Sequence, residues 1–301
     1  MASDAERPRS PRGDHTNSEP SVDGVDAELR VVQRRWKRRL LRRVGAITGI
    51  VMTVILTGWW LGFDLGYLYA HRSNLIEILF GEMLAPDALW AQLQADAPRL
   101  GPAAVETLAI AAVGTALGLP LALCLGTLAA GNVSPPLIYR PARLALGGLR
   151  AVPSMVYALL FVILAGLGPV AGALAIAVGT IGDLGRLFAD ELEEIDPTPV
   201  EAVRSTGASV LATTSAARYP QVLTAYGAWT LFYLEINARK SSVLGIVGAG
   251  GLGHPLIMAF RARNYTRVMA VILTILVLVV GVETVANWLR DRLGVERRAE
   301  R

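Results

Sequence analysis

Long apolar runs separated by short charged segments dominate the chain. A helix needs roughly 20 mostly apolar residues to cross about 30 Å of hydrocarbon. Six runs approach this length, at residues 44–63, 105–130, 153–167, 171–188, 222–247 and 268–288. The third run is short, which predicts a tilted or ragged span, and Pro120 predicts a kink near the middle of the second. The pattern therefore predicts an all-α integral membrane protein with about six transmembrane helices.

Polar segments divide the chain around these runs. Residues 1–29 are rich in Pro, Ser, Asp and Arg and poor in large apolar side chains, which predicts a disordered cytoplasmic tail. Residues 30–103 are expected to form a basic anchor, the first transmembrane helix and an acidic external loop. Residues 104–289 would form the membrane core, and residues 290–301 a basic cytoplasmic tail.

Basic residues indicate the orientation, because cytoplasmic loops are enriched in Lys and Arg. Eight cationic residues between Arg30 and Arg43, and five arginines after Trp288, predict that both termini are cytoplasmic. Three arginines between residues 140 and 150 mark a further cytoplasmic loop. Three others disagree with the rule, because they fall on the predicted outer side: Arg261, Arg263 and Arg267.

Composition supports a membrane protein and narrows its chemistry. The chain is 53% hydrophobic and 18% charged, with a mean hydropathy of +0.44. The net charge of +4 does not indicate nucleic-acid binding, because the basic residues cluster at membrane edges, where they contact lipid. Cys124 is the single cysteine, and the three histidines have no metal-ligand spacing, so neither a disulfide framework nor a metal site is expected.

The polar segment between the fourth and fifth runs predicts a helix, a hinge and a second helix on the cytoplasmic side. Thr198, followed by Pro199 and then Glu201, reads as a capping box that starts a helix at Thr198. Gly207 interrupts that helix, and a second helix over residues 209–218 should end at Pro220. The whole segment is expected to be exposed.

This segment resembles the EAA loop of ABC-importer permeases, with Glu201, Ala202, Gly207 and Pro220 at its defining positions. Val203 and Tyr219 depart from the usual Ala and Leu. Residues 149–196 and 231–253 look like the corresponding stretches of phosphonate-uptake permeases, and the resemblance covers residues 105–289. It implies a type I ABC-importer permease in which the loop is the coupling helix that docks on a cytoplasmic ATPase.

The resemblance also implies partners and cargo. The chain would form a homodimer in the bacterial cytoplasmic (inner) membrane, with two ATPase subunits that bind ATP and Mg and an extracytoplasmic substrate-binding protein. The cargo would be phosphonate or a related oxyanion such as phosphate or phosphite. The nearest alternative is an ABC importer for another small solute, such as an amino acid or a quaternary amine, although no aromatic cage flanks the charges of the fifth run.

Two sequence motifs concern nucleotides. Gly248, Gly250 and Gly253 fit G-x-G-x-x-G, but a dinucleotide site needs a preceding strand and an acidic residue about 20 positions later. Neither is present, so Gly248, Gly250, Gly251 and Gly253 are instead expected to form a closely packed external turn. No G-x-x-x-x-G-K-[ST] motif occurs, so the chain is expected not to be an enzyme and ATP hydrolysis requires a partner.

Ionisable residues lie near the centre of the fifth run, where each charge costs roughly 2.5–3.5 kcal/mol on insertion scales. Glu235 and Arg239 are four residues apart and can pair, which leaves Lys240 unmatched. One interpretation is a structural ion pair between helices. The other is an anion translocation path lined by six residues: Glu235, Asn237, Arg239, Lys240, Ser241 and Ser242.

Other classes of protein fit less well. Asp183 and Arg186 are expected to pair or to reach the membrane edge rather than to serve function. An ion-coupled secondary transporter predicts an inverted repeat with two broken helices, and the sequence has one Gly-rich interruption and no repeat. A membrane enzyme is disfavoured because no nucleophile, metal or acid–base constellation lies at a membrane edge.

Overall fold

A computed structural model describes residues 22–292 of the chain, and every regular element in that range is helical. The predicted tail over residues 1–21 and the last nine residues lie outside this range. The chain divides into two compact units, and the boundary between them follows Arg72.

The first unit contains α1 (Val22–Trp60) and α2 (Leu65–Ala70). Residues 22–29 are the beginning of α1, which differs from the disordered tail expected there. The part long and apolar enough to span a membrane is Arg39–Trp60. A turn through Gly62 ends α1, and the Asp64 carboxylate caps α2 by accepting hydrogen bonds from the amides of Gly66 and Tyr67.

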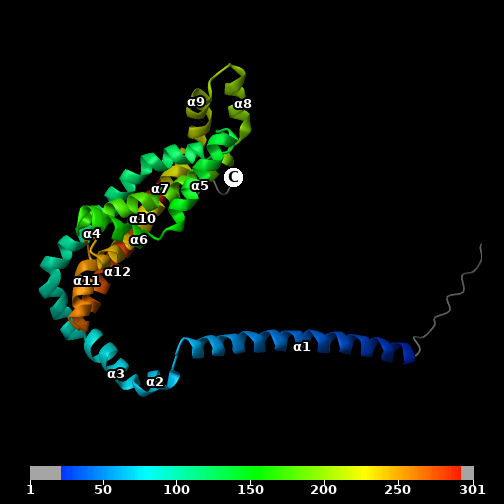
Figure 1. Cartoon of the computed structure of the whole chain (residues 1–301), viewed down its shortest axis with the longest axis vertical. Coiled ribbons are helices and arrows are strands. Elements are labelled where there is room, and N and C mark those ends of the chain that lie inside the picture. Colours follow the sequence, from blue (N-terminus) through cyan, green and yellow to red (C-terminus); the bar gives the residue numbers. More distant parts are fainter. Residues whose placement is uncertain (1–21, 293–301) are drawn as a thin grey trace, which may run out of the picture. The chain divides into compact units, whose positions relative to one another are not determined.

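The second unit holds the remaining elements. They are, in chain order, α3 (Arg72–Ile76), η1 (Glu77–Met83), α4 (Pro86–Leu128), α5 (Pro136–Ala151), α6 (Ser154–Ala165), α7 (Pro169–Glu193), α8 (Pro197–Ser205), α9 (Val210–Thr213), η2 (Thr214–Arg218), α10 (Tyr219–Leu244), η3 (Gly245–Val247), α11 (Gly253–Arg261) and α12 (Tyr265–Arg292). The helices α8 and α9 project from one end of this bundle, and α11 lies at the other end (Figure 1).

The six predicted spans correspond to helices of three kinds. Within residues 22–292, α4, α7, α12 and part of α1 are long and apolar enough to cross a membrane. The predicted third span is only α6, whose 12 residues reach about 18 Å. It meets α5 at an angle of 85°, and the pair is long and apolar enough only together, as a broken span or a re-entrant loop. The predicted fifth span is α10, which has 26 residues but is too polar to meet the same test.

Helical structure extends beyond the predicted boundaries. The helix α4 has 43 residues and begins at Pro86, inside the predicted external loop, because nothing between Pro86 and Leu128 ends the helix, including its three internal prolines. The cytoplasmic loop predicted at residues 140–150 is largely α5. An amphipathic helix satisfies its backbone groups internally, which an open loop at a membrane surface cannot do.

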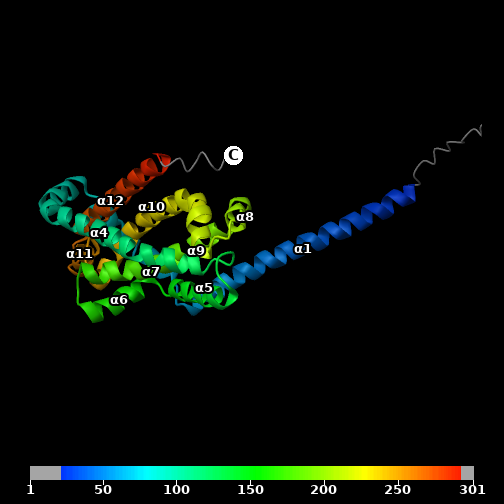
Figure 2. The same ribbon diagram turned by 90° about the horizontal axis from the view of Figure 1, so that it is seen from above.

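Small residues hold α4 and α7 together. A Cβ atom added at Gly114, Gly118 or Gly126 would lie 2.6–2.7 Å from a backbone carbonyl oxygen of α7. The three glycines recur at multiples of four residues and so share one face of α4. Backbones this close are typical of helix pairs in lipid, where packing rather than the hydrophobic effect drives association. The two helices run side by side in both views (Figures 1 and 2).

Candidate functional site

The projecting hairpin begins with a capped helix. Asp196 is the N-cap of α8, and its carboxylate accepts a hydrogen bond of 2.9 Å from the Thr198 amide. That bond lowers the pKa of the Asp196 carboxyl. The N-cap therefore lies two residues before the predicted Thr198 and the helix begins at Pro197, because Pro197 suits the first helical position and Asp196 supplies the capping oxygen. The capping box predicted between Thr198 and Glu201 is not formed.

Gly207 separates the two arms of the hairpin. The helix α8 ends at Ser205, and Gly207 has a φ of +80°, in the left-handed region that favours glycine. The second arm starts at Ser209, whose hydroxyl accepts from the Ala212 amide and caps α9. Pro220 does not end this arm as predicted, because it occupies the first turn of α10, where a missing N–H costs nothing.

The outer surface of the hairpin is partly apolar. Glu201, Ala202 and Gly207 are exposed, as are the large side chains of Val210 (54%) and Leu211 (80%). Val200 is instead buried, at 7% exposed. The two arms of the hairpin thus contact each other, and the outer surface presents both a carboxylate and apolar side chains.

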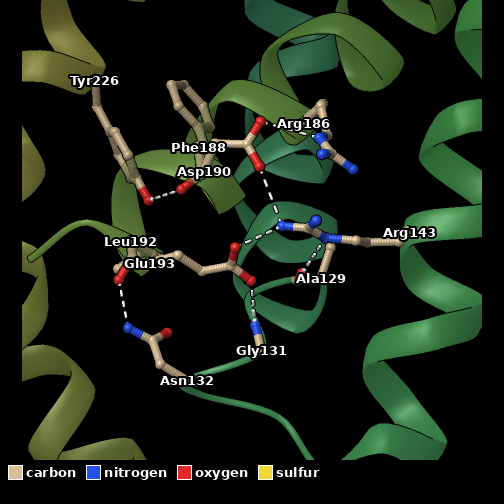
Figure 3. A network of polar contacts seen from close by, with 10 residues as sticks. All are labelled: Ala129, Gly131, Asn132, Arg143, Arg186, Phe188, Asp190, Leu192, Glu193 and Tyr226. Atoms are coloured by element: carbon tan, nitrogen blue, oxygen red, sulfur yellow. Dashed lines mark hydrogen bonds and ion pairs between the residues drawn. The ribbon is translucent and has the colours of Figure 1, made fainter.

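A polar network secures the base of this hairpin (Figure 3). Arg143 of α5 forms ion pairs with Asp190 at 3.0 Å and Glu193 at 2.8 Å, both on α7. Glu193 also accepts a hydrogen bond from the Gly131 amide, and Arg186 pairs with Asp190 at 2.9 Å. Of the two alternatives expected for Arg186 and Asp183, a pair between them is not formed, because Asp190 lies four residues on, one turn along the same helix face.

The end of α7 and the second arm of the hairpin are both tied to one turn between α4 and α5. The Asn132 side chain donates to the Leu192 carbonyl at the end of α7, and the Arg218 guanidinium donates to the Asn132 carbonyl at 2.9 Å. Arg218 is 1% exposed and also donates to the Thr214 hydroxyl. Burial lowers the pKa of Arg218, with a smaller contribution from Arg204, but arginine stays charged at neutral pH.

No pattern in the sequence predicts this network. In the sequence Arg143 indicated only the orientation of the chain, because its partners Asp190 and Glu193 lie 47 and 50 residues away. Arg218 stood at the end of a helix expected to be exposed. Only the folded arrangement brings these groups together.

The uncharged polar residues of α10 join it to its neighbours. The Asn237 amide donates to the hydroxyls of Thr115 on α4 and Thr180 on α7, both at 2.9 Å. Ser241 donates to the Thr107 carbonyl, also on α4. Asn237 and both serines, Ser241 and Ser242, are buried, so none of the three lines an open surface of this chain.

The charged residues of α10 form two triads, each with one carboxylate and two cations. Glu235 lies 3.4 Å from Arg239 and 3.5 Å from Arg290 of α12. In the second triad, Asp183 of α7 pairs with Lys240 at 3.2 Å and with Arg150 at 3.3 Å. The sequence predicted that Lys240 would have no partner. This prediction is wrong, because α7 places Asp183 beside it.

The triads leave positive charge on α10. Four cations surround two carboxylates, so each triad carries an excess of one positive charge. The Arg239 side chain is 57% exposed and that of Lys240 30%. Of the six residues proposed for the translocation path, these two cations thus reach the open surface.

The Gly-rich turn packs against α4 and the start of α7. Gly248, Gly250 and Gly251 have positive φ angles, and a Cβ at Gly250 would lie 2.6 Å from a carboxylate oxygen of Glu106. A Cβ at Gly253 would lie 2.3 Å from the Ser242 carbonyl oxygen. Close packing is thus the observed state of this turn. In the range 22–292 no group of three His, Cys, Asp or Glu side chains could hold a metal ion.

The sequence is similar to those of known transport permeases. A family model described as "Binding-protein-dependent transport system inner membrane component" matches residues 122–295. The chain is 32% identical over 280 residues to the phosphite transport system permease protein PtxC of Stutzerimonas stutzeri, across 91% of this chain and 98% of that protein. It is 46% identical over 192 residues to the phosphate-import permease protein PhnE of Mycolicibacterium smegmatis, across 64% of this chain and only 36% of that relative.

Solved structures resemble the fold. An inward-facing structure of the MetNI methionine ABC transporter has a TM-score of 0.56 at 22% identity, and it covers 64% of this chain and 95% of its own. A bacterial ABC transporter involved in the import of alginate has a TM-score of 0.54 at 15% identity, with 86% and 99% covered. At these identities the likeness concerns the fold alone.

Proposed function

Because the chain belongs to the inner-membrane components of binding-protein-dependent transport systems, we propose that it is the permease subunit of an ATP-driven importer for phosphonate, phosphate or phosphite. The observation that carries the choice of cargo is the similarity to a phosphite permease along 91% of the chain. The excess positive charge on α10 supports an anionic cargo, since charged groups at membrane depth commonly mark a substrate pathway.

The projecting hairpin is proposed to dock on the ATPase. Its apolar residues Val210 and Leu211 are exposed, as is Glu201, and its base is tied to the turn between α4 and α5. A docking element needs both properties, because an exposed tip contacts the partner and a fixed base transmits the movement. ATP and Mg would be bound by that partner, since this sequence carries no P-loop motif.

The proposed assembly contains two copies of this chain, two ATPase subunits and a binding protein. Each chain has one hairpin, which matches one ATPase subunit per chain. Closure of the ATPase pair would move the hairpins and convert the pathway between inward- and outward-facing states. A measured mass of the purified complex with a single copy of this chain for two ATPases would exclude the homodimer.

Both termini are proposed to be cytoplasmic, with α8 and α9 on the same side. We expect Ala212→Cys in a Cys124→Ser background to react with a membrane-impermeant thiol reagent only from the cytoplasmic side, because Ala212 is exposed on the hairpin. Ala262→Cys, exposed after α11, should react only from outside. Labelling of both positions from the same side would contradict this orientation.

Arg239 and Lys240 are proposed to attract the anion along its path, while Asn237, Ser241 and Ser242 hold the helices together. We expect Arg239→Gln or Lys240→Gln to lower uptake roughly fivefold or more, the effect of one unit charge about 4 Å from an anion in water. Assembly should persist, because Glu235 keeps Arg290 and Asp183 keeps Arg150. Uptake and basal ATPase activity are measured in the same vesicles.

A structural role would give a different pattern. If Arg239→Gln weakens assembly and the double change Glu235→Gln with Arg239→Gln restores both assembly and uptake, the pair is scaffolding. If uptake is also unchanged in Lys240→Gln, neither cation has a role in the translocation path.

The experiment that tests the function is an ATPase assay of the reconstituted complex with its binding protein. Phosphonates, phosphite and inorganic phosphate are compared with sulfate, an amino acid and a quaternary amine. Stimulation by a phosphorus oxyanion supports the proposal, and stimulation by another solute alone assigns a different cargo. Uptake driven by an ion gradient without ATP would instead favour a secondary transporter.

A further inference from the structure

A cavity of about 920 Å³ lies at the end of the second unit that is remote from the α8–α9 hairpin. Its walls come from α4, from the loop before α7, from the Gly-rich turn, from α11 and from the start of α12. The ionisable side chains that line it are three arginines, one carboxylate and one histidine: Arg99, Arg261, Arg267, Glu106 and His254.

The charges in this cavity are only partly compensated. Arg267 lies 3.0 Å from Asp96, which is buried and also accepts a hydrogen bond from Gln92. Arg99 and Arg261 are exposed, and neither has a carboxylate within 4.0 Å in the described part of the chain. Glu106 likewise has no cation within that distance. Two free guanidinium groups therefore face one free carboxylate.

The cavity gives a reason for the arginines that disagree with the positive-inside rule. Residues 261–267 fall on the side opposite the hairpin, where cations are normally scarce. Two of the three arginines there, Arg261 and Arg267, line the cavity, and Arg99 joins them from α4. Guanidinium groups bind tetrahedral oxyanions through paired hydrogen bonds, which a lysine cannot reproduce.

We infer that this cavity is the outer receiving site for the oxyanion, which it collects on release from the binding protein before passage along α10. This inference rests on the proposed function. The volume lies within the range of small-molecule sites and far exceeds one phosphorus oxyanion, so the anion enters hydrated. Glu106 reduces the net positive charge of the cavity and so weakens anion binding. Transport requires this, because the anion must also be able to leave the site.

The test measures the local potential directly. Met258 lines the cavity and is 46% exposed, so Met258→Cys in the Cys124→Ser background places one thiol there. The complete complex, in sealed vesicles of zwitterionic lipid, is treated from outside with thiosulfonate reagents of opposite charge. We expect the anionic reagent to react faster than its cationic counterpart, and millimolar inorganic phosphate, phosphite or methylphosphonate to slow both.

Charge variants sharpen the expected result. Arg261→Gln should slow the anionic reagent two- to threefold, about the Coulomb effect of one charge ~8 Å away in water, and speed the cationic one equally. Glu106→Gln should change both rates in the opposite sense. Arg263→Gln is the matched control, because it removes the same charge two residues away, outside the cavity lining, and should have a smaller effect.

Several outcomes would overturn the inference. They are reactivity only from the cytoplasmic side, reagent rates that ignore Arg261→Gln, and no protection by any of the three anions. Protection that requires anionic lipid would assign the cavity to a lipid phosphate, and a parallel loss of binding-protein affinity in Arg261→Gln would make it a docking surface. Each of these results can occur while phosphorus oxyanions still stimulate the ATPase, so the two proposals fail separately.

Discussion

Gly118→Val is expected to prevent assembly of the permease. A Cβ at Gly118 would lie 2.6 Å from the Ala177 carbonyl oxygen and 2.9 Å from the Thr180 Cβ, so α4 and α7 would have to separate. Overpacking of this kind costs about 1–3 kcal/mol or more, which is roughly a 5- to 150-fold change in the ratio of folded to unfolded protein. The yield of monodisperse complex after detergent extraction, and its thermal midpoint, measure the effect.

Gly281→Val is the matched control, because Gly281 lies in another long apolar helix, α12, where a Cβ meets no atom within 4 Å and no proline follows. Valine replaces glycine in a helix at little cost in intrinsic propensity, so yield should stay close to that of the unchanged protein. Equal loss in both variants would show that the long apolar helices do not tolerate valine in place of glycine, whatever the contact. Equal survival would show that the α4–α7 contact is looser than described.

Gly207→Val is expected to uncouple ATP hydrolysis from uptake while the protein still inserts. A non-glycine residue in the left-handed region costs about 1–2 kcal/mol, and β-branched valine is among the least tolerant. No atom lies within 4 Å of a Cβ at Gly207, so the effect comes from backbone conformation and not from a clash. Uptake stimulated by the binding protein should fall roughly 5- to 30-fold.

Gly207→Asn provides the comparison, because asparagine adopts positive φ more readily than other residues. It should retain most of the uptake. Normal coupled transport in Gly207→Val would count against the hairpin as the docking element. A loss of insertion in both variants would instead place Gly207 among residues needed for folding.

Much of the architecture follows from local pattern. The all-α class and the permease family were predicted and are confirmed, because apolar runs and the hairpin with Glu201 and Gly207 are encoded in contiguous residues. Gly207 has the predicted hinge conformation. The start of α8 was missed by two residues, since both Thr198 and Asp196 offer a capping oxygen and only the folded chain chooses between them.

The polar contacts between helices could not be predicted. Lys240 finds Asp183 57 residues earlier, and Arg218 finds the Asn132 carbonyl 86 residues earlier. Nothing local indicates which face of α7 meets α10, so the pairing of their charges depends on the tertiary packing. The role of α10 in transport stays a prediction for the same reason, because polar residues that line a path and polar residues that join helices look alike in sequence.

The length of α4 has a mechanical consequence. Its 43 residues extend about 64 Å, roughly twice the hydrocarbon thickness. The part from Arg99 at the cavity to Leu128, just before the turn at Asn132, covers roughly 45 Å of this length. One helix therefore connects the cavity to the turn that holds the base of the hairpin. Pro120 lacks the N–H that would donate one of the hydrogen bonds between them, so bending should concentrate there. If α4 moves as a lever, then by thermodynamic reciprocity nucleotide on the ATPase and anion in the cavity must alter each other's affinity by the same factor.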